Sequence, residues 1–269
     1  MAAIILVAMM RRVLAVLASV WMIAAAALLT RVAFVWDQQR KIPHEVLATV
    51  PFDNEAGNIA NALAQGRGFS DVFRKPTGAT AWLAPVYPLL LGGIFRLFGA
   101  FTYSAFLAAA LLNCVFSAAA TVPLFFAARR VGGVAAAALA GWIWAFSPGG
   151  VMLPFEWIWD TSLSVLLLTT LVWATFEIAE SGSRWKWIGY GAMWGLALLT
   201  NPAIGILLPF FPVWLAARRR NGTARDWRGP AIAVAVAVLF CVPWTIRNCV
   251  EFHRLIPLRS NFAFEWWIG

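Results

Sequence analysis

Long apolar runs alternate with short polar segments along most of this chain. The runs cover approximately residues 13–35, 103–128, 134–146, 161–178, 188–199, 203–217 and 231–244. Several approach the roughly 20 residues that an α-helix needs to cross a bilayer core of about 30 Å. None shows the period of two that is typical of barrel strands. Because backbone groups in lipid need partners within their own segment, the pattern predicts an all-α polytopic membrane protein with about seven transmembrane helices.

Composition supports this class. Hydrophobic residues make up 62% of the 269 residues, and charged residues only 12%, which suits a membrane protein better than a soluble domain. The first run is longer than the apolar region of a signal peptide, so we expect an uncleaved first span. The three cysteines show no CxxC spacing, which argues against a disulfide or a metal site.

The net charge of +9 is explained by topology. Basic residues cap apolar runs at Arg11–Arg12, Arg129–Arg130, Arg184 with Lys186, and Arg218–Arg220. The positive-inside rule places these clusters and the N-terminus in the cytoplasm. We therefore expect the charge to set orientation in the membrane, with no binding of nucleic acid.

This topology leaves three polar segments on the outward side. The longest is residues 36–101, the predicted first outward loop, and the others are residues 147–160 and the tail beyond residue 244. Residues 85–99 are apolar but short, and Arg96 interrupts them, which favours an interfacial or re-entrant helix. The chain from residue 1 to residue 269 is interpreted as a single transmembrane domain.

The stretch FDNEAGNIANALAQGRGF (residues 52–69) predicts a short interfacial helix within the first loop. Ile59 and Leu63 are spaced by four residues, as on one face of a helix, and Gly66 suits the end. Asp53 and Glu55 would lie at the positive end of the helix dipole. That position suits a catalytic base or a cation ligand, and equally a plain N-cap formed by Asp53 or Asn54.

Charged residues converge on the outward side. An arginine can hold a phosphate at two points, and a carboxylate can accept a proton from an attacking hydroxyl. The charges therefore suit a reaction with an anionic lipid-linked substrate, although ordinary solvated loop charges would look the same. The candidates are the acids Asp53, Glu55, Glu156 and Asp160 and the basic residues Arg74, Lys75, Arg247, Arg254 and Arg259.

Several segments in fixed order resemble a known family. After Asp53 and Glu55 come IANALAQGRGFS, PTGATAWLAPVYPLLLGGIFRLFG, FEWIWDTSLS, GLALLTNPAIGILLPF and VPWTIRNCVEFHRLIPLRSN. From about Trp36 to Gly269, this combination resembles the GT-C membrane glycosyltransferases. It is most similar to the bacterial branch related to protein O-mannosyltransferases and the lipid A aminoarabinose transferase. The resemblance implies transfer of a hexosyl or pentosyl unit from a polyprenyl-phosphate donor to a lipid, protein or glycan acceptor, on the non-cytoplasmic side of a bacterial inner membrane.

The resemblance also implies roles for individual residues. The base would be Glu55 or Asp53, with Glu55 preferred because it directly precedes the AGNIA segment. Asp160 matches an acidic position of the second outward loop, where it would orient the acceptor or, as in metal-using relatives, help to hold a divalent cation. Arg247 and Arg259 match basic positions that face the donor phosphate.

Two features depart from the family pattern. The acids form an Asp-x-Glu pair farther along the loop than the family's Asp-Glu pair, which leaves Asp37 as a competing base. Relatives also continue well beyond EWWIG, so we expect a truncated chain that lacks part of the donor groove. The alternatives are therefore an inactive remnant, or a transporter or flippase for a lipid-linked or anionic solute. The absence of a clear internal repeat weighs against a transporter.

Overall fold

A computed structural model describes the chain at residues 19–179, 183–218 and 227–261. Within these ranges the chain is helical and contains no strand, apart from one isolated bridge between Ser70 and Ala79. The predicted all-α class is confirmed. Residues 13–18 of the expected first span and the EWWIG segment lie outside the described residues.

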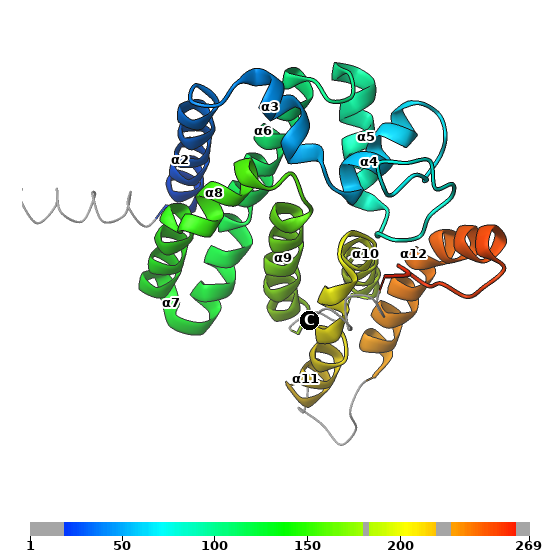
Figure 1. Ribbon diagram of the computed structural model, residues 1–269. Coiled ribbons are helices and arrows are strands. Elements are labelled where there is room, and N and C mark those ends of the chain that lie inside the picture. The colour runs from blue at the N-terminus through cyan, green and yellow to red at the C-terminus, as the bar shows by residue number, and fades with distance from the viewer. Residues whose placement is uncertain (1–18, 180–182, 219–226, 262–269) are drawn as a thin grey trace, which may run out of the picture.

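Upright helices form the body of the molecule (Figure 1). They are α2 (Val20–Gln39), α6 (Tyr103–Ala119), α7 (Thr121–Phe146), α9 (Thr161–Ala179), α10 (Arg184–Thr200) and α12 (Arg228–Phe252). Helix α2 packs against α6 and α7, α9 packs against α6, α7 and α10, and α10 packs against α12. The result is a row of helices in which neighbours in space are mostly neighbours in sequence.

Four helical stretches are long and apolar enough to cross a bilayer: Val20–Gln39, Tyr103–Glu156, Thr161–Ala179 and Arg228–Phe252. The predicted number of about seven spans is therefore not confirmed. Helix α10 has 17 residues, about 26 Å of helix, which is short of a bilayer core of about 30 Å. The expected span over residues 203–217 is divided into η2 (Pro202–Leu207) and α11 (Phe210–Arg218). Pro209 lies between these two elements and cannot donate the backbone hydrogen bond that a continuous helix needs.

The 54-residue stretch Tyr103–Glu156 reverses direction at Gly132 and Gly133. Gly133 has a φ of +75°, a conformation that glycine adopts without a steric penalty. After the turn, Trp144 Nε1 donates a 2.8 Å hydrogen bond to the Ser117 carbonyl on the preceding arm. The reversal directly follows Arg129–Arg130, the pair from which the sequence predicts the end of one span.

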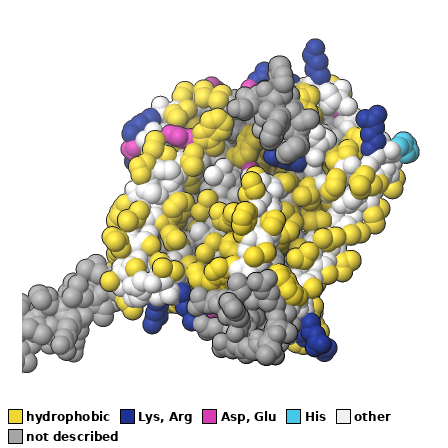
Figure 2. All heavy atoms as spheres, turned by 90° about the horizontal axis from the view of Figure 1, so that it is seen from below, with side chains coloured by type: hydrophobic (Ala, Val, Ile, Leu, Met, Phe, Trp, Pro, Cys, Tyr) yellow, Lys and Arg dark blue, Asp and Glu magenta, His cyan; other side chains and the backbone are white. Residues whose placement is uncertain are grey.

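The flanks of the helices expose apolar side chains. Leu29, Leu139 and Leu239 are 68%, 63% and 65% exposed. Figure 2 shows hydrophobic side chains over most of the described surface seen from below, with Lys and Arg at its margins. An apolar surface of this extent suits lipid rather than water, and the protein is membrane-embedded.

Residues 36–101, the predicted first outward loop, form a layer at one end of the bundle (Figure 1). It contains α3 (His44–Thr49), η1 (Val50–Phe52), α4 (Glu55–Ala64) and α5 (Val86–Phe98). Phe52 and Phe95 anchor the layer, because their rings meet edge to face at 4.8 Å and both are buried. The structure adds α3 and, in the second loop, α8 (Pro148–Glu156), neither of which the apolar pattern predicts.

Helix α4 has the limits that the sequence predicts. Asn54 is its N-cap, with the side chain accepting a 2.9 Å hydrogen bond from the Gly57 N–H. A Cβ on Gly57 would lie 2.1 Å from the Phe52 carbonyl oxygen, so the first turn can pack this closely only with glycine. The chain leaves the helix at Gly66, whose φ is +76°.

The tail turns back from α12 toward the first outward loop. The turn begins at His253, which has a left-handed φ of 52°. Trp244 Nε1 donates a 2.7 Å hydrogen bond to the Leu258 carbonyl. The Ser260 N–H then donates a 2.8 Å hydrogen bond to the Ala81 carbonyl. These bonds attach the segment that carries Arg259 to the first loop.

Arg31 in α2 is fully buried, although the predicted span contains almost no charge. Its Nε donates to Ser117 Oγ at 2.8 Å, Nη1 donates to the Ala145 carbonyl at 3.1 Å, and Nη2 donates to the Trp144 carbonyl at 3.1 Å. These carbonyls lie at the C-terminal end of α7, the negative end of the helix dipole. The guanidinium thus shares the terminal carbonyl groups of α7 with Thr30 and Ser147, and links α2, α6 and α7.

Candidate functional site

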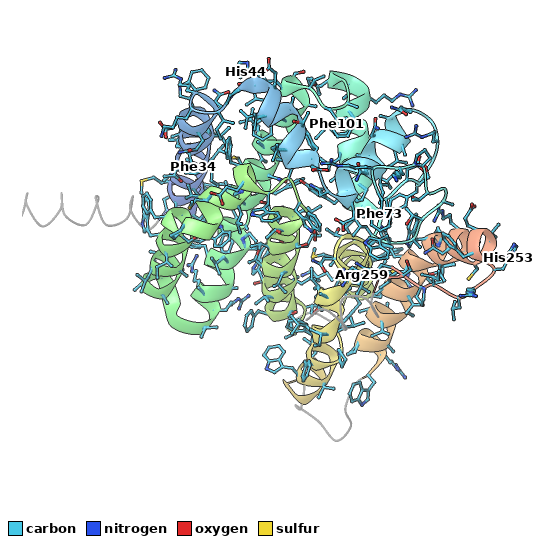
Figure 3. The ribbon with its side chains drawn as sticks, viewed as in Figure 1. Phe34, His44, Phe73, Phe101, His253 and Arg259 are labelled. Atoms are coloured by element: carbon cyan, nitrogen blue, oxygen red, sulfur yellow. The ribbon has the colours of Figure 1, made fainter. Side chains whose placement is uncertain are left out.

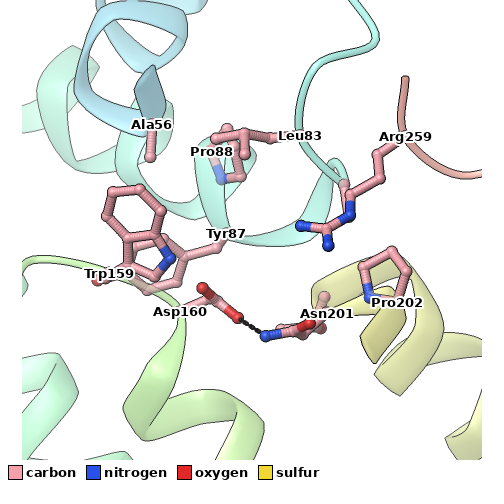
Figure 4. A pocket seen from close by; sticks show the side chains of 11 residues that line it. Ala56, Leu83, Tyr87, Pro88, Trp159, Asp160, Asn201, Pro202 and Arg259 are labelled. Carbon is pink, nitrogen blue, oxygen red and sulfur yellow. Dashed lines mark hydrogen bonds between the residues drawn. The ribbon is translucent and has the colours of Figure 1, made fainter. Parts of the chain in front are cut away.

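A cavity of about 60 Å³, called cavity one below, opens between the first outward loop and the ends of α9 and α10. Figure 4 shows side chains from several distant segments pointing into it. They include Ala56 of α4, Tyr87 of α5, Trp159 and Asp160 before α9, Asn201 after α10, and Arg259 of the tail. Two of the predicted site residues, Asp160 and Arg259, therefore line one cavity.

Asp160 is the buried acid of cavity one, with 7% of its surface exposed. Its Oδ2 accepts hydrogen bonds from Ser164 Oγ at 2.7 Å and from Asn201 Nδ2 at 2.9 Å (Figure 4). Asp160 directly precedes α9, so the carboxylate also lies at the positive end of a helix dipole. These contacts hold the carboxylate in one orientation.

Burial raises the pKa of the Asp160 carboxyl above its ordinary value, because a charge is less stable away from water. The hydrogen bonds from Ser164 and Asn201 and the positive charge of Arg259 oppose this rise. The net direction is upward. Asp160 is thus a carboxyl whose charge carries an energetic cost in the folded protein, which is common at functional sites.

Arg259 reaches cavity one from the tail (Figure 3). The side chain is partly buried, and it forms no hydrogen bond or ion pair with any residue in the described ranges. None of the five N–H donors of its guanidinium is therefore used by a residue in those ranges. An arginine in this situation can bind a phosphate at two points.

Tyr87 and Trp159 form the opposite wall of cavity one (Figure 4). The Tyr87 hydroxyl donates a 3.1 Å hydrogen bond to Asn113 Oδ1. Complete burial holds the pKa of this hydroxyl well above its usual range. Tyr87 therefore stays neutral and contributes an apolar ring, rather than a proton, to the cavity.

A second cavity of about 420 Å³, called cavity two below, lies on the other side of α4. Its lining includes Thr49, Asp53, Asn58, Asn61, Arg74 and Phe101. Asp53 and Arg74, both predicted site residues, form an ion pair with Arg74 Nε donating to Asp53 Oδ1 at 2.7 Å. The hydrogen bonds from Arg74 lower the pKa of the Asp53 carboxyl. Lys75, which follows Arg74, is exposed.

Glu55, the preferred base, is the first residue of α4. It follows Asp53, which lines cavity two, and precedes Ala56, which lines cavity one. The side chain is partly exposed and has no hydrogen-bond or ion-pair partner in the part of the chain that the structure describes. Glu55 thus lies between the two cavities along the chain without lining either.

Arg247 contacts the first outward loop through its guanidinium. Nη1 donates to the Thr80 carbonyl at 2.6 Å, and Nη2 donates to the Phe69 carbonyl at 2.9 Å. The guanidinium also lies over the rings of Phe69 and Trp244, 5.7 Å and 5.1 Å from their centroids. The structure therefore gives Arg247 a role in holding the loop, and it does not line either cavity.

A comparison with family models identifies the chain. The model of the dolichyl-phosphate-mannose-protein mannosyltransferase family matches residues 82–246, which is more than half of the chain. The chain belongs to this mannosyltransferase family. No curated protein and no solved structure matches it.

Membership in the mannosyltransferase family makes the chain a membrane glycosyltransferase that uses a polyprenyl-phosphate-linked sugar. The matched region includes Tyr87, Asp160 and Asn201 of cavity one. Glu55 and Arg259 lie outside it. The family match therefore includes the buried acid of cavity one and the side chains of Tyr87 and Asn201. It gives no information on Glu55 and Arg259, which lie outside the matched residues.

Asp37, the competing base, lies on the surface at the end of α2. It forms an ion pair with Lys41, and both side chains are 58% exposed. Asp37 lines neither cavity one nor cavity two. Asp37 is thus outside the cavity that contains Asp160 and Arg259.

Asn201 is a site residue that the sequence pattern does not single out. It follows the apolar run of α10 and precedes Pro202, which by itself indicates only a turn. Its Nδ2 holds Asp160, while its Oδ1 accepts a 3.0 Å hydrogen bond from the Ala203 N–H. Because both halves of the amide have partners, the orientation of Asn201 is fixed by its contacts.

A divalent cation is the one cofactor that the family resemblance suggests. Within the described ranges, no three His, Cys, Asp or Glu side chains gather closely enough to hold a metal ion. Cavity one offers a single carboxylate, Asp160, whereas a hard divalent cation prefers several oxygen ligands. These residues are a poor fit for a resident cation, so no catalytic step is derived through one.

Proposed function

We propose that this mannosyltransferase family member transfers a sugar from a polyprenyl-phosphate donor to an acceptor on the non-cytoplasmic side of a bacterial inner membrane, with its N-terminus in the cytoplasm. The observation that carries the proposal is that Asp160 and Arg259, from distant parts of the sequence, line one cavity beside the start of α4. At about 60 Å³ the cavity is too small to enclose a sugar phosphate. Its anchored carboxylate and its arginine, which has no ion-pair partner in the described ranges, would therefore contact a sugar hydroxyl and the phosphate at the mouth of the cavity.

Arg259 would bind the donor phosphate. A guanidinium matches two phosphate oxygens, and its positive charge stabilises the charge that develops on the phosphate as it leaves. Arg259 has no ion-pair partner in the described ranges to compete with the phosphate. The exposed apolar side chains of the upright helices provide a surface on which the polyprenyl tail can remain in the bilayer.

Asp160 would position the donor sugar. Its two hydrogen bonds from protein side chains both go to Oδ2, which leaves Oδ1 to accept a hydrogen bond from a sugar hydroxyl. Asn201 and Ser164 already fix the carboxylate, so its side chain loses little conformational entropy when the sugar binds. Asp160 would therefore bind and orient the sugar, while Arg259 would bind the phosphate of the same donor.

Glu55 would act as the general base. The acceptor hydroxyl oxygen forms a bond to the anomeric carbon, and the bond from that carbon to the phosphate oxygen breaks. The phosphate leaves with the bonding electron pair, and the hydroxyl proton moves to the Glu55 carboxylate. A positioned base of this kind contributes about 10²–10⁴-fold to the rate. Asp53 is less available for this role because it is paired with Arg74.

A transporter receives less support from the structure. The buried charge in the described part of the first span is Arg31, and its N–H groups are bound to Ser117 and to main-chain carbonyls. A group bound in this way fixes helix packing and is not open to a passing solute. Transporter sites instead expose ionisable groups to a solute pathway.

The direct test is transfer of a labelled sugar from polyprenyl-phosphate donors by the full chain in lipid vesicles. We expect Glu55→Gln to lower the transfer rate at least about 100-fold. Glu45→Gln, which neutralises an exposed carboxylate of the same loop, is the matched control and should transfer normally. Normal transfer by Glu55→Gln would remove the base assignment, and no transfer by the wild-type chain would contradict the proposed function.

A further inference from the structure

We infer that cavity two binds a neutral sugar residue, so that the acceptor of the transfer is a glycan. That the bound sugar is an acceptor rests on the proposed function, whereas the binding of a sugar is argued from cavity two alone. The cavity, at about 420 Å³, is within the range of about 300–1,000 Å³ that is typical of ligand sites. Phe101, part of its lining, lies beside the loop layer at the outer end of the bundle (Figure 3).

Two amides in cavity two keep hydrogen-bonding capacity for a ligand. Asn58 Nδ2 donates to the Val72 carbonyl at 3.2 Å, which leaves Asn58 Oδ1 as an acceptor. Asn61 Oδ1 accepts from Gln65 Nε2 at 2.9 Å, which leaves Asn61 Nδ2 as a donor. The two residues are three apart on α4 and therefore neighbours on one face. A donor beside an acceptor suits hydroxyl groups, which both donate and accept.

The charges in cavity two favour a neutral ligand. Arg74 binds Asp53 through two nitrogen–oxygen contacts. The positive charge that could attract a phosphate or a carboxylate is therefore already neutralised. An anionic ligand would have to break this pair or approach the Asp53 carboxylate. A sugar without charged groups meets neither obstacle.

Phe101 supplies an apolar wall. Its φ of 55° lies in the left-handed region, which is uncommon for a bulky residue and persists only where the surroundings enforce it. The ring packs against Phe95 at 5.3 Å and Phe52 at 6.4 Å, yet the residue stays partly exposed in the lining. A pyranose has an apolar C–H face that can lie on such a ring while its hydroxyls reach the asparagines.

The geometry of α4 connects this sugar site to the proposed base. With about 100° of rotation per residue, Asn58 and Asn61 face nearly opposite to Ala56, which lines cavity one. Glu55 projects between these two directions at the start of the helix. An acceptor sugar in cavity two and a donor sugar at the mouth of cavity one would therefore approach Glu55 from opposite sides.

The test is saturation-transfer NMR on the full chain in nanodiscs. The probes are the neutral methyl glycosides of glucose, mannose, galactose and N-acetylglucosamine, with glucose 6-phosphate as the anionic comparison. We expect at least one neutral glycoside to bind, and Asn61→Leu to weaken it at least tenfold. Gln38→Leu, an amide-to-apolar change on α2 outside both cavities, is the control and should bind normally. Asn61→Asp, which removes the free donor while keeping the shape, should weaken binding as well.

Three outcomes would overturn the inference: no glycoside binds, folded Asn61 variants bind like wild type, or glucose 6-phosphate binds the Arg259→Gln variant more tightly than methyl glucoside does. The Arg259→Gln background removes the phosphate site that is proposed in cavity one. The assay contains no donor, so it is independent of transfer. Glycoside binding without transfer would support cavity two and count against the proposed function. Transfer without glycoside binding would do the reverse. Glu55→Gln should keep glycoside binding while it loses transfer.

Discussion

Asn201 donates a 2.9 Å hydrogen bond to Oδ2 of Asp160, although the two residues lie 41 positions apart in the sequence. The bond joins the end of α10 to the start of α9 and directs a buried carboxylate into cavity one (Figure 4). Because the same cavity contains Arg259 of the tail, its chemistry depends on how segments far apart in the sequence are packed together. The predictions below separate the residues that build this site from those that would contact substrate.

Asp160→Asn should make the folded protein more stable at neutral and alkaline pH while it impairs transfer. Burial raises the pKa of Asp160, so the folded state binds this proton more tightly than the unfolded state. Below the unfolded value of about 3.9, both states are protonated and the carboxyl costs nothing. As the pH rises through the higher folded pKa, the folded state must hold a buried charge and loses stability.

Thermal unfolding of Asp160→Asn and wild type from about pH 4 to about pH 8 tests this prediction. We expect the melting temperature of the variant to exceed that of wild type at high pH, by a margin that shrinks as the pH falls. Asp37→Asn, at an exposed position, controls for loss of a surface carboxylate. An Asp160→Asn variant that is equally destabilised at every pH would contradict the assignment.

Gly150→Ala should destabilise the junction around Arg31, whereas Gly149→Ala should not. A Cβ on Gly150 would lie 2.6 Å from Arg31 Nη2 and 2.7 Å from Ser147 Oγ. Moving Arg31 away would break its bond to the Trp144 carbonyl. Overpacking of this kind costs about 1–3 kcal/mol. A Cβ on Gly149 would meet only Leu153 Cδ1 at 3.8 Å, an ordinary contact.

The measurement is the free energy of unfolding of both glycine variants in the same detergent. We expect Gly149→Ala to be neutral or slightly stabilising, because alanine favours helix over glycine by about 1 kcal/mol. Equal stability of the two variants would show that Arg31 is not held as tightly as its hydrogen bonds indicate.

Arg247→Ala should release the first outward loop. The substitution removes two charged hydrogen bonds, to the Thr80 and Phe69 carbonyls, and we expect a loss of about 3 kcal/mol in the free energy of unfolding. Arg247→Lys keeps the positive charge but lacks the two terminal nitrogens that reach both carbonyls, so we expect an intermediate loss in the free energy of unfolding. Limited proteolysis should show faster cleavage between residues 66 and 85 in Arg247→Ala.

The same variant separates two roles for Arg247. The family resemblance implies contact with the donor phosphate, whereas the structure shows the guanidinium bound to loop carbonyls. If Arg247→Ala unfolds like wild type but binds polyprenyl phosphate more weakly, Arg247 is a phosphate ligand. If Arg247→Ala has a lower free energy of unfolding than wild type, weaker donor binding by this variant follows from displacement of the loop.

Local patterns were enough to predict the elements of this fold that depend on neighbouring residues. Helix α4 begins at Glu55, directly after its N-cap Asn54, and the chain leaves it by Gly66, because a cap and a left-handed glycine act within one turn of the chain. The reversal after Arg129–Arg130 follows from two adjacent glycines. The number of spans was harder to predict, because apolar composition does not reveal where Pro209 ends a helix or that α10 has only 17 residues.

The candidate site could be predicted only in part, since its contacts join distant segments. The sequence indicated Asp160 and Arg259, but nothing in the spacing showed that Asn201 would hold Asp160. Arg74 was expected to bind substrate phosphate, and its pairing with Asp53, 21 residues earlier, emerges only from the fold of the loop. Cavity two was missed for the same reason, because its asparagines suggested no more than a polar helix.

The most direct test of the account is the affinity of the full chain for polyprenyl phosphate, a probe that carries the phosphate without requiring the identity of the sugar. We predict that Arg259→Gln weakens binding about 10- to 100-fold, since charged hydrogen bonds of about 1.5–3 kcal/mol are lost. Arg254→Gln, an exposed arginine of the same tail outside both cavities, should bind like wild type. Equal affinities for Arg259→Gln and Arg254→Gln would contradict the placement of the donor phosphate in cavity one.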